Sequence, residues 1–161
     1  MNHHDTPQEE PAEHLRFWAH LSALEQVTDA DEADADEADV VGRVLTDPDQ
    51  TMAQSALVRH VDRRAAELHS GPGYEPWAET MARATTRYPF LIQRLREWSL
   101  FRAVTLGRPW HPDALLESSN WLQLKTAEAS HPAALGVLAT GGRTKRIRNA
   151  ARTSIQKHGS A

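Results

Sequence analysis

Two adjacent stretches, HPDALLESSNWLQLKTAEAS (111–130) and HPAALGVLATGGRTKRIRNAARTS (131–154), decide the expected fold. Each begins with His-Pro, which suits the N-cap and first residue of a helix, because proline there leaves no backbone N–H unpaired. The segments SSN and GGRT then interrupt the helical pattern, so a second helix is expected in each stretch. Self-similarity at this period is typical of stacked helix pairs.

The second helices of the two stretches align when the sequence is shifted by 23 residues. At this shift Leu124 corresponds to Ile147 and Lys125 corresponds to Arg148. The pattern therefore predicts that buried positions match buried positions and that a base matches a base.

The remaining sequence also has helical periodicity. Helical spacing recurs in four more segments. The residues that mark one face of each are Leu15–Trp18–Leu21–Leu24, Met52–Ala53–Ala56–Leu57–Val61–Ala65–Leu68, Trp77–Met81–Ala84 and the line Leu91–Leu95–Trp98–Arg102, in which Arg102 alone is not apolar. No stretch alternates long enough to predict a strand. We therefore expect an all-α fold of stacked antiparallel helix pairs, as a short solenoid or an irregular helical bundle.

Two segments resemble a known family. LGVLATGGRTKRIRNAA (135–151) and VVGRVLTDPDQTMAQSALVRHVDRRAA (40–66) are similar to helical-hairpin repeats of the HEAT-like kind, especially the leucine-rich-repeat variant class. The resemblance covers residues 40–68 and 111–153. It implies a curved stack of helices that binds protein or nucleic acid, usually without catalysis.

Charge is distributed unevenly along the chain. Acidic residues outnumber basic ones fourteen to two in residues 1–49, and seven of the eleven residues from Asp29 to Asp39 are acidic. Like charges at helical spacing repel each other, which disfavours an isolated helix there. We expect a solvated acidic linker or, alternatively, an acidic contact segment. The predicted organisation is an N-terminal helix with this linker (1–39), followed by a helical repeat-like domain (40–158).

The C-terminal stretch is basic, because no acidic residue follows Glu128. On a helix beginning near Thr144, Ile147 and Ala151 would face the preceding helices while the bases face outward. A capping helix needs a polar outer face, but a face with one sign of charge also suits an anionic partner. The candidate partner-binding residues are Arg143, Lys145, Arg146, Arg148 and Arg152.

A second polar cluster lies in RHVDRRAAELH (59–69). Its spacing predicts surface ion pairs, each worth about 0.2–0.5 kcal/mol. The alternative is an anion-contacting ridge formed by Arg59, His60 and Arg63.

The tryptophans fall into two groups. Four lie on apolar helical faces and are predicted to be packing anchors: Trp18, Trp77, Trp98 and Trp121. Trp110 lies instead in the loop GRPWHPD. It either plugs a junction between helices or is an exposed aromatic anchor at an interface.

Several kinds of chemistry are not indicated by the sequence. There is no cysteine, which excludes disulfides and thiolate catalysis, and no nucleotide-binding, hydrolase or metalloprotease motif. The pairs His14/His20 and His60/His69 miss the i,i+3 and i,i+4 spacing of a helical metal site. We expect no catalytic residue, no metal and no cofactor.

The expected location is the cytoplasm, without a membrane partner, because no apolar run approaches the ~20 residues of a membrane span. Arginine far outnumbers lysine and alanine is abundant, a bias that resembles proteins of GC-rich bacterial genomes.

The first functional hypothesis is a non-enzymatic, protein-binding module. The alternative is a nucleic-acid-binding protein that uses the basic C-terminal helix. An unfamiliar enzyme is less favoured and would need a pocket lined by His60, Arg63 and Glu67. The identity of the partner and the oligomeric state stay open.

Overall fold

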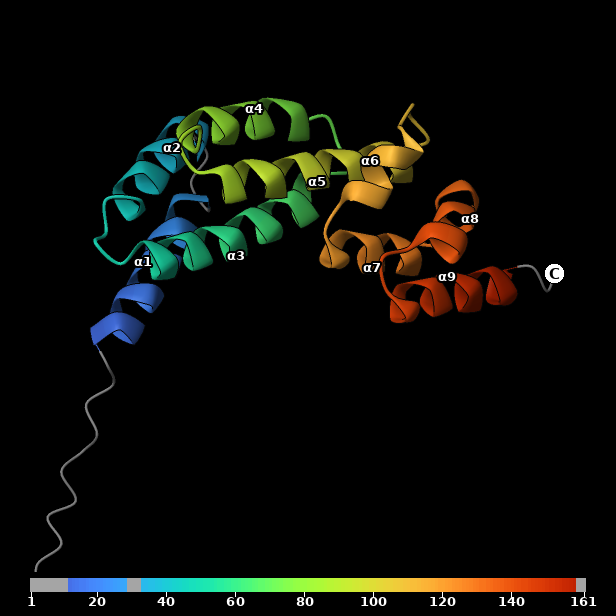
Figure 1. The fold of residues 1–161 in the computed structure, drawn as a ribbon. Helices are drawn as coiled ribbons and strands as arrows, with labels where there is room; N and C mark the ends of the chain where they lie inside the picture. The colour runs from blue at the N-terminus through green and yellow to red at the C-terminus, as the bar shows by residue number, and fades with distance from the viewer. Residues whose placement is uncertain (1–11, 29–32, 159–161) are drawn as a thin grey trace, which may run out of the picture.

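The computed structural model describes residues 12–28 and 33–158 of the chain. This part of the chain is helical and contains no strand (Figure 1), which confirms the predicted all-α class. The helices are α1 (Ala12–Thr28), α2 (Ala33–Val44), α3 (Gln50–Leu68), α4 (Tyr74–Ala84), α5 (Pro89–Thr105), α6 (Pro112–Glu117), α7 (Asn120–Glu128), α8 (Pro132–Gly141) and α9 (Lys145–His158). None of the helices in the described ranges is long and apolar enough to cross a membrane.

Proline determines where three of the helices begin. Pro89, Pro112 and Pro132 each occupy the first turn of a helix, where the missing N–H costs nothing. His111 and His131 occupy the N-cap positions as predicted, although neither side chain makes a capping hydrogen bond. The two His-Pro sequences therefore start helices through proline.

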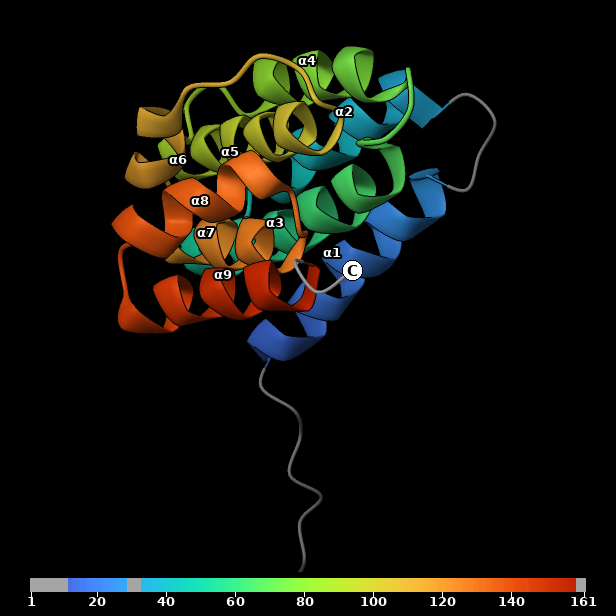
Figure 2. The ribbon, with the colours of Figure 1, turned by 90° about the vertical axis from the view of Figure 1, so that its right-hand side faces the viewer.

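The two His-Pro stretches form two successive helix pairs, α6–α7 and α8–α9. Helix α8 packs on α6, and α9 packs on α7, so equivalent helices of the two pairs are neighbours (Figure 2). The N-caps correct the sequence alignment. Ser119 Oγ accepts a hydrogen bond from Leu122 N, and Thr144 Oγ1 accepts one from Ile147 N. Leu122 rather than Leu124 therefore corresponds to Ile147, because α8 has 10 residues whereas α6 has 6 and the turn before α9 is one residue longer than the turn before α7.

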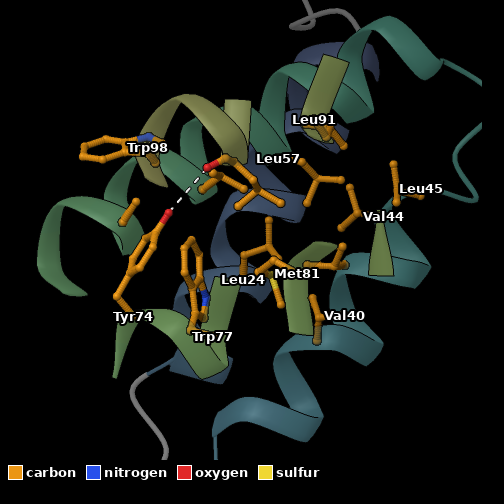
Figure 3. Packing of buried hydrophobic residues seen from close by; sticks show 14 of the residues in the cluster. Leu24, Val40, Val44, Leu45, Leu57, Tyr74, Trp77, Met81, Leu91 and Trp98 are labelled. Carbon is orange, nitrogen blue, oxygen red and sulfur yellow. Dashed lines mark hydrogen bonds between the residues drawn. The ribbon is translucent and has the colours of Figure 1, made fainter. Parts of the chain in front are cut away.

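A first hydrophobic core lies among α1 to α5. Figure 3 shows Leu24 of α1 among residues of α2, α3 and α4, including Val40, Leu57 and Met81. The predicted line on α5 is confirmed, because Leu91, Leu95, Trp98 and Arg102 are all buried.

A second, smaller core lies under α8 and α9. It contains Leu115, Leu135, Leu138 and Ile147, and Val104 near the end of α5 also belongs to it. Helix α5 therefore contributes to both cores and connects the two halves of the molecule.

Trp121 and Lys125 of α7 close the junction between the halves. The Trp121 ring packs edge-on against Trp98 with 5.6 Å between ring centroids. The guanidinium of Arg94 lies 3.4 Å from the centroid of the Trp121 ring, and Lys125 Nζ lies 4.9 Å from that of Trp98. Cation–π contacts therefore add to apolar packing where α7 meets α5.

The solvated linker predicted over residues 29–39 is wrong where the structure describes it. Helix α2 begins at Ala33, and the side chain of Glu37 is fully buried. Repulsion between neighbouring acids disfavours this helix in isolation, but Glu37 is neutralised by partners from α3. Residues 29–32 lie outside the described residues.

Helix α1 also differs from the prediction. It packs on α2 and α3, yet only Leu24 of its apolar stripe is fully buried, whereas Leu15 and Trp18 are 58% and 54% exposed. The prediction that Trp18 is a packing anchor is therefore wrong. Trp77 and Trp98 are buried as predicted.

Candidate interaction surfaces

Helix α9 is attached to the molecule along one face. Ile147 and Ala151 are buried against the second core, and Ser154 Oγ donates a hydrogen bond to the carbonyl of Ala127 on α7. The loop before α9 requires glycine at position 142, where a Cβ atom would lie 2.7 Å from the Leu138 carbonyl oxygen and 2.8 Å from Ile147 Cγ2. This close approach holds the start of α9 against α8.

The basic residues predicted for this helix lie together on its outer side. We define the basic face as Arg143, Lys145, Arg146, Arg148 and Arg152. Lys145, Arg148 and Arg152 follow one line along the helix, about 10 Å from end to end at 1.5 Å per residue. Lys145, Arg146 and Arg152 are exposed, while Arg148 is half-buried.

None of these five cations takes part in an ion pair between described residues. Two of them are oriented by backbone carbonyls instead. Arg143 Nη1 donates to Ser118 O at 3.0 Å, and Arg148 Nη1 donates to Gly142 O at 2.8 Å. The basic face is therefore partly fixed in position while its charge is uncompensated by neighbouring side chains.

The position of these cations is unfavourable for the helix itself. The N-terminus of a helix carries a partial positive charge, which favours acidic residues in the first turn. Helix α9 has no acidic residue there and instead begins with Lys145 and Arg146. A negatively charged partner would relieve this repulsion.

The three residues predicted as a ridge on α3 differ in exposure and in partners, although all three line one hollow beside α1. Arg59 is exposed, and its guanidinium lies 5.7 Å from the centroid of the Trp18 ring. His60 is buried and directed at Glu37. Arg63 Nη2 donates to Thr28 Oγ1 at 3.2 Å and lies 3.3 Å from His60 Nδ1. The predicted ion pair on this flank is present between Arg63 and Glu67, at 3.6 Å.

Glu37 is the centre of a buried polar network that the sequence analysis missed. Its carboxylate accepts hydrogen bonds from His60 Nε2 at 2.7 Å, from Trp77 Nε1 at 3.0 Å and from Arg64 Nη2 at 3.1 Å. Burial by itself raises the pKa of Glu37, but these hydrogen bonds outweigh it and lower the pKa to about 2. The carboxylate is therefore ionised at neutral pH and joins α2 to α3 and α4.

This network fixes the tautomer of His60. An ionised carboxylate only accepts hydrogen bonds, so His60 Nε2 carries the proton that Glu37 accepts. Its Nδ1 then faces the guanidinium of Arg63 as an acceptor. The signal in the sequence was the position of Glu37, three and four residues before Val40 and Val41 on an apolar helical face.

Asp62 forms a second polar centre that was not predicted. It accepts a two-pronged interaction from Arg94, at 2.8 Å and 2.6 Å, and a hydrogen bond from Trp98 Nε1 at 2.8 Å. Asp47 is a separate polar centre, whose carboxylate accepts a hydrogen bond from His20 Nε2 at 2.9 Å. The hydrogen bond from His20 is the main reason that the pKa of Asp47 lies below its usual value.

Trp110 lies at the edge of the second core. Its side chain is half-buried and packs against the cluster that contains Leu115 and Leu135. Of the two predicted roles, this position agrees with a plug at the junction of helices.

Among the described residues, no group of three histidine or carboxylate side chains is arranged to hold a metal ion.

The candidate residues thus lie in two separate places. The basic face belongs to α9 and the turn before it, whereas Arg59, His60 and Arg63 belong to α3, and α9 packs mainly on α7 and α8 (Figure 1). The structure does not join them into one continuous cationic surface. No family model, curated protein or solved structure matches this chain.

Proposed function

We propose that this protein is a non-enzymatic interaction module, a short HEAT-like stack of helices that docks a protein partner through its basic face. The partner presents an acidic surface to Lys145, Arg146 and Arg152. The proposal includes a cytoplasmic location and a bacterial source, in keeping with the composition of the chain.

The observation that carries this proposal is the absence of ion pairs at the basic face within the described residues. Elsewhere in the molecule, arginines such as Arg64, Arg94 and Arg102 contact carboxylates at 3.1 Å or less. The exposed arginines Arg43, Arg87 and Arg96 are also without an ion pair among the described residues, but they lie on different elements and not along one helix. Unpaired exposed cations give an interface long-range electrostatic attraction and discrimination between partners.

The location of α9 adds support. Helix α9 packs on α7 and α8, and its opposite side carries the exposed bases. Because Arg143 and Arg148 already bond to carbonyl groups, part of this surface is ordered before a partner arrives. Such preorganisation reduces the entropy lost on binding.

The test is a pull-down from nuclease-treated native cell extract, with the wild-type chain and the variant Lys145→Glu/Arg146→Glu/Arg152→Glu as bait. These three side chains are exposed and make no hydrogen bond or ion pair with other described residues, so the variant is expected to fold. A matched control, Arg43→Glu/Arg87→Glu/Arg96→Glu, changes net charge equally at exposed arginines outside α9. Proteins retained by the wild type and the control but lost from the α9 variant support the proposal. Equal retention by all three baits contradicts it.

A second candidate function is nucleic-acid binding, favoured by the four arginines among the five residues of the basic face. Arginine binds phosphate oxygens through two parallel hydrogen bonds, which lysine cannot do. If five phosphates are neutralised, affinity for duplex DNA falls roughly several hundredfold between about 50 and 200 mM salt. Fluorescence anisotropy with labelled DNA and RNA oligonucleotides measures this dependence. No binding at low salt excludes this candidate and leaves the protein-binding proposal standing.

A further inference from the structure

A hollow with a volume of about 320 Å³ lies between α1 and α3, on a part of the molecule remote from the basic face. Its lining comes from four residues of α1 and three of α3, namely Trp18, Leu21, Ser22, Glu25, Arg59, His60 and Arg63. The spacing of the α1 residues, i, i+3, i+4 and i+7, places them on one face of that helix. Small-molecule pockets have volumes of about 300–1,000 Å³, so this hollow suits a small ligand.

One part of the hollow is apolar. Trp18 is 54% exposed, and Leu21 lies one helical turn further along the same face. Arg59 lies over the Trp18 ring at 5.7 Å from its centroid. An exposed indole with a cation beside it offers a surface on which an apolar or aromatic side chain packs favourably.

The hollow also carries charges of both signs that are not joined. Glu25 and Arg59 line the same space and neither forms an ion pair with a described residue, whereas Arg63 is paired with Glu67 at 3.6 Å. Arg63 is held by Thr28 and by His60, and His60 is anchored on Glu37 at 2.7 Å. The unpaired cation of Arg59 therefore lies in the same hollow as the unpaired carboxylate of Glu25, beside an Arg63 side chain that is held in place.

This separation of charge selects the kind of ligand. A simple anion meets attraction from Arg59 and repulsion from Glu25, and a simple cation meets the reverse. A molecule with a carboxylate at one end and an ammonium group at the other satisfies both sides at once. We propose that the hollow binds a free α-amino acid with an apolar or aromatic side chain. The carboxylate contacts Arg59 and Arg63, the ammonium group contacts Glu25, and the side chain packs on Trp18 and Leu21.

The first measurement compares three probes by isothermal titration calorimetry on the full-length chain. L-phenylalanine carries both charged groups, phenylacetate lacks the ammonium group, and 2-phenylethylamine lacks the carboxylate. We expect L-phenylalanine to bind about tenfold more tightly than either of the others, because each loses one hydrogen-bonded charge. Absence of binding by all three, or equal binding by all three, overturns the proposal.

Variants then assign each charge to its role. Glu25→Gln is expected to remove the advantage of L-phenylalanine over phenylacetate, and Arg59→Gln to remove its advantage over 2-phenylethylamine. Both residues are exposed, so neither change should prevent folding. Trp18→Ala is expected to weaken all three probes by a similar factor.

The matched controls are Glu79→Gln and Arg96→Gln, which change exposed side chains of α4 and α5. Both should leave the affinity for L-phenylalanine unchanged. If the controls weaken binding as much as Glu25→Gln and Arg59→Gln do, the site lies elsewhere and the assignment is wrong. The α9 variant Lys145→Glu/Arg146→Glu/Arg152→Glu should also retain this affinity, so the outcome here does not depend on the proposed docking function.

Discussion

The two ends of the molecule use arginine in different ways. Between α1 and α5, the buried and half-buried arginines end on carboxylates, as Arg64 does on Glu37 and Arg94 does on Asp62. On α9, Arg146 and Arg152 are exposed and contact no carboxylate among the described residues. The difference teaches that charge at the first end holds helices together, whereas charge on α9 contributes little to the fold and is available to a partner. Substitutions at each end test this contrast.

The largest effect is expected from Glu37→Gln. The change leaves Arg64 without its buried anion, with only the exposed carboxylate of Glu67 at 3.4 Å, and disturbs the hydrogen bonds from His60 and Trp77. Breaking a buried charge pair in this way costs about 3–5 kcal/mol, which urea unfolding monitored by circular dichroism measures. The control is Glu79→Gln, because Glu79 pairs with Arg83 at 3.8 Å and both side chains are 72% exposed. A loss of stability in Glu37→Gln no larger than in this control would refute the role of the network.

The same carboxylate predicts how stability depends on pH. The pKa of Glu37 is about 2 in the folded protein, against an ordinary value of 4.5. As the pH falls, the unfolded chain takes up this proton at a higher pH than the folded protein does. The contribution of Glu37 to the free energy of unfolding is therefore fully present above about pH 4.5 and is lost as the pH falls toward 2. It amounts to about 3 kcal/mol, at 1.36 kcal/mol per pKa unit.

Urea unfolding at a series of pH values between these limits measures this contribution. The variant Glu37→Gln should have a much shallower acid dependence than the wild type. Part of the acid dependence of stability should remain in Glu37→Gln, because the pKa of Asp47 is also lowered, chiefly by its hydrogen bond with His20. Parallel curves for the two proteins would contradict the assignment to Glu37.

Asp62→Asn should have an intermediate effect. The substitution removes the charge that receives both Arg94 and Trp98, but this site is half-buried and water can replace part of what is lost. We expect a loss of about 1–3 kcal/mol, the usual range for hydrogen bonds to charged groups. Thermal unfolding compared with the exposed control Asp39→Asn provides the measurement. A change within the error of that control would mean that the Arg94 contact contributes nothing to stability.

The smallest effect, and one of opposite sign, is expected at the basic face. Lys145→Glu places an acid in the first turn of α9, where it complements the helix dipole. The free energy of unfolding should rise by about 0.3–1 kcal/mol. Lys157→Glu, in the last turn of the same helix, should lower it by a similar amount. If Lys145→Glu destabilises the protein, Lys145 supports the fold and the contrast between the two ends is weaker than we infer.

Some of this organisation could be predicted from the sequence, because it depends on neighbouring residues. Helices α6 and α8 follow from His-Pro, and the outward placement of Lys145, Arg146 and Arg152 follows from the positions of Ile147 and Ala151. The burial of Glu37 depends on His60, Arg64 and Trp77, which are distant in sequence, so local charge repulsion suggested a linker instead. Trp18 had the spacing of a core residue, but only Leu24 of that stripe on α1 is fully buried.

The buried amide of Gln123 has a mechanical consequence. Its nitrogen donates to carbonyls at the end of α6, those of Leu115 and Leu116, while its oxygen accepts from the backbone N–H of Arg143. One side chain of α7 thus clamps both the preceding turn and the turn that leads into α9. A pull on α9 by any bound molecule is transmitted through this clamp to α7 and onward to α5, so the last helix is expected to move together with its neighbours and not to peel away alone.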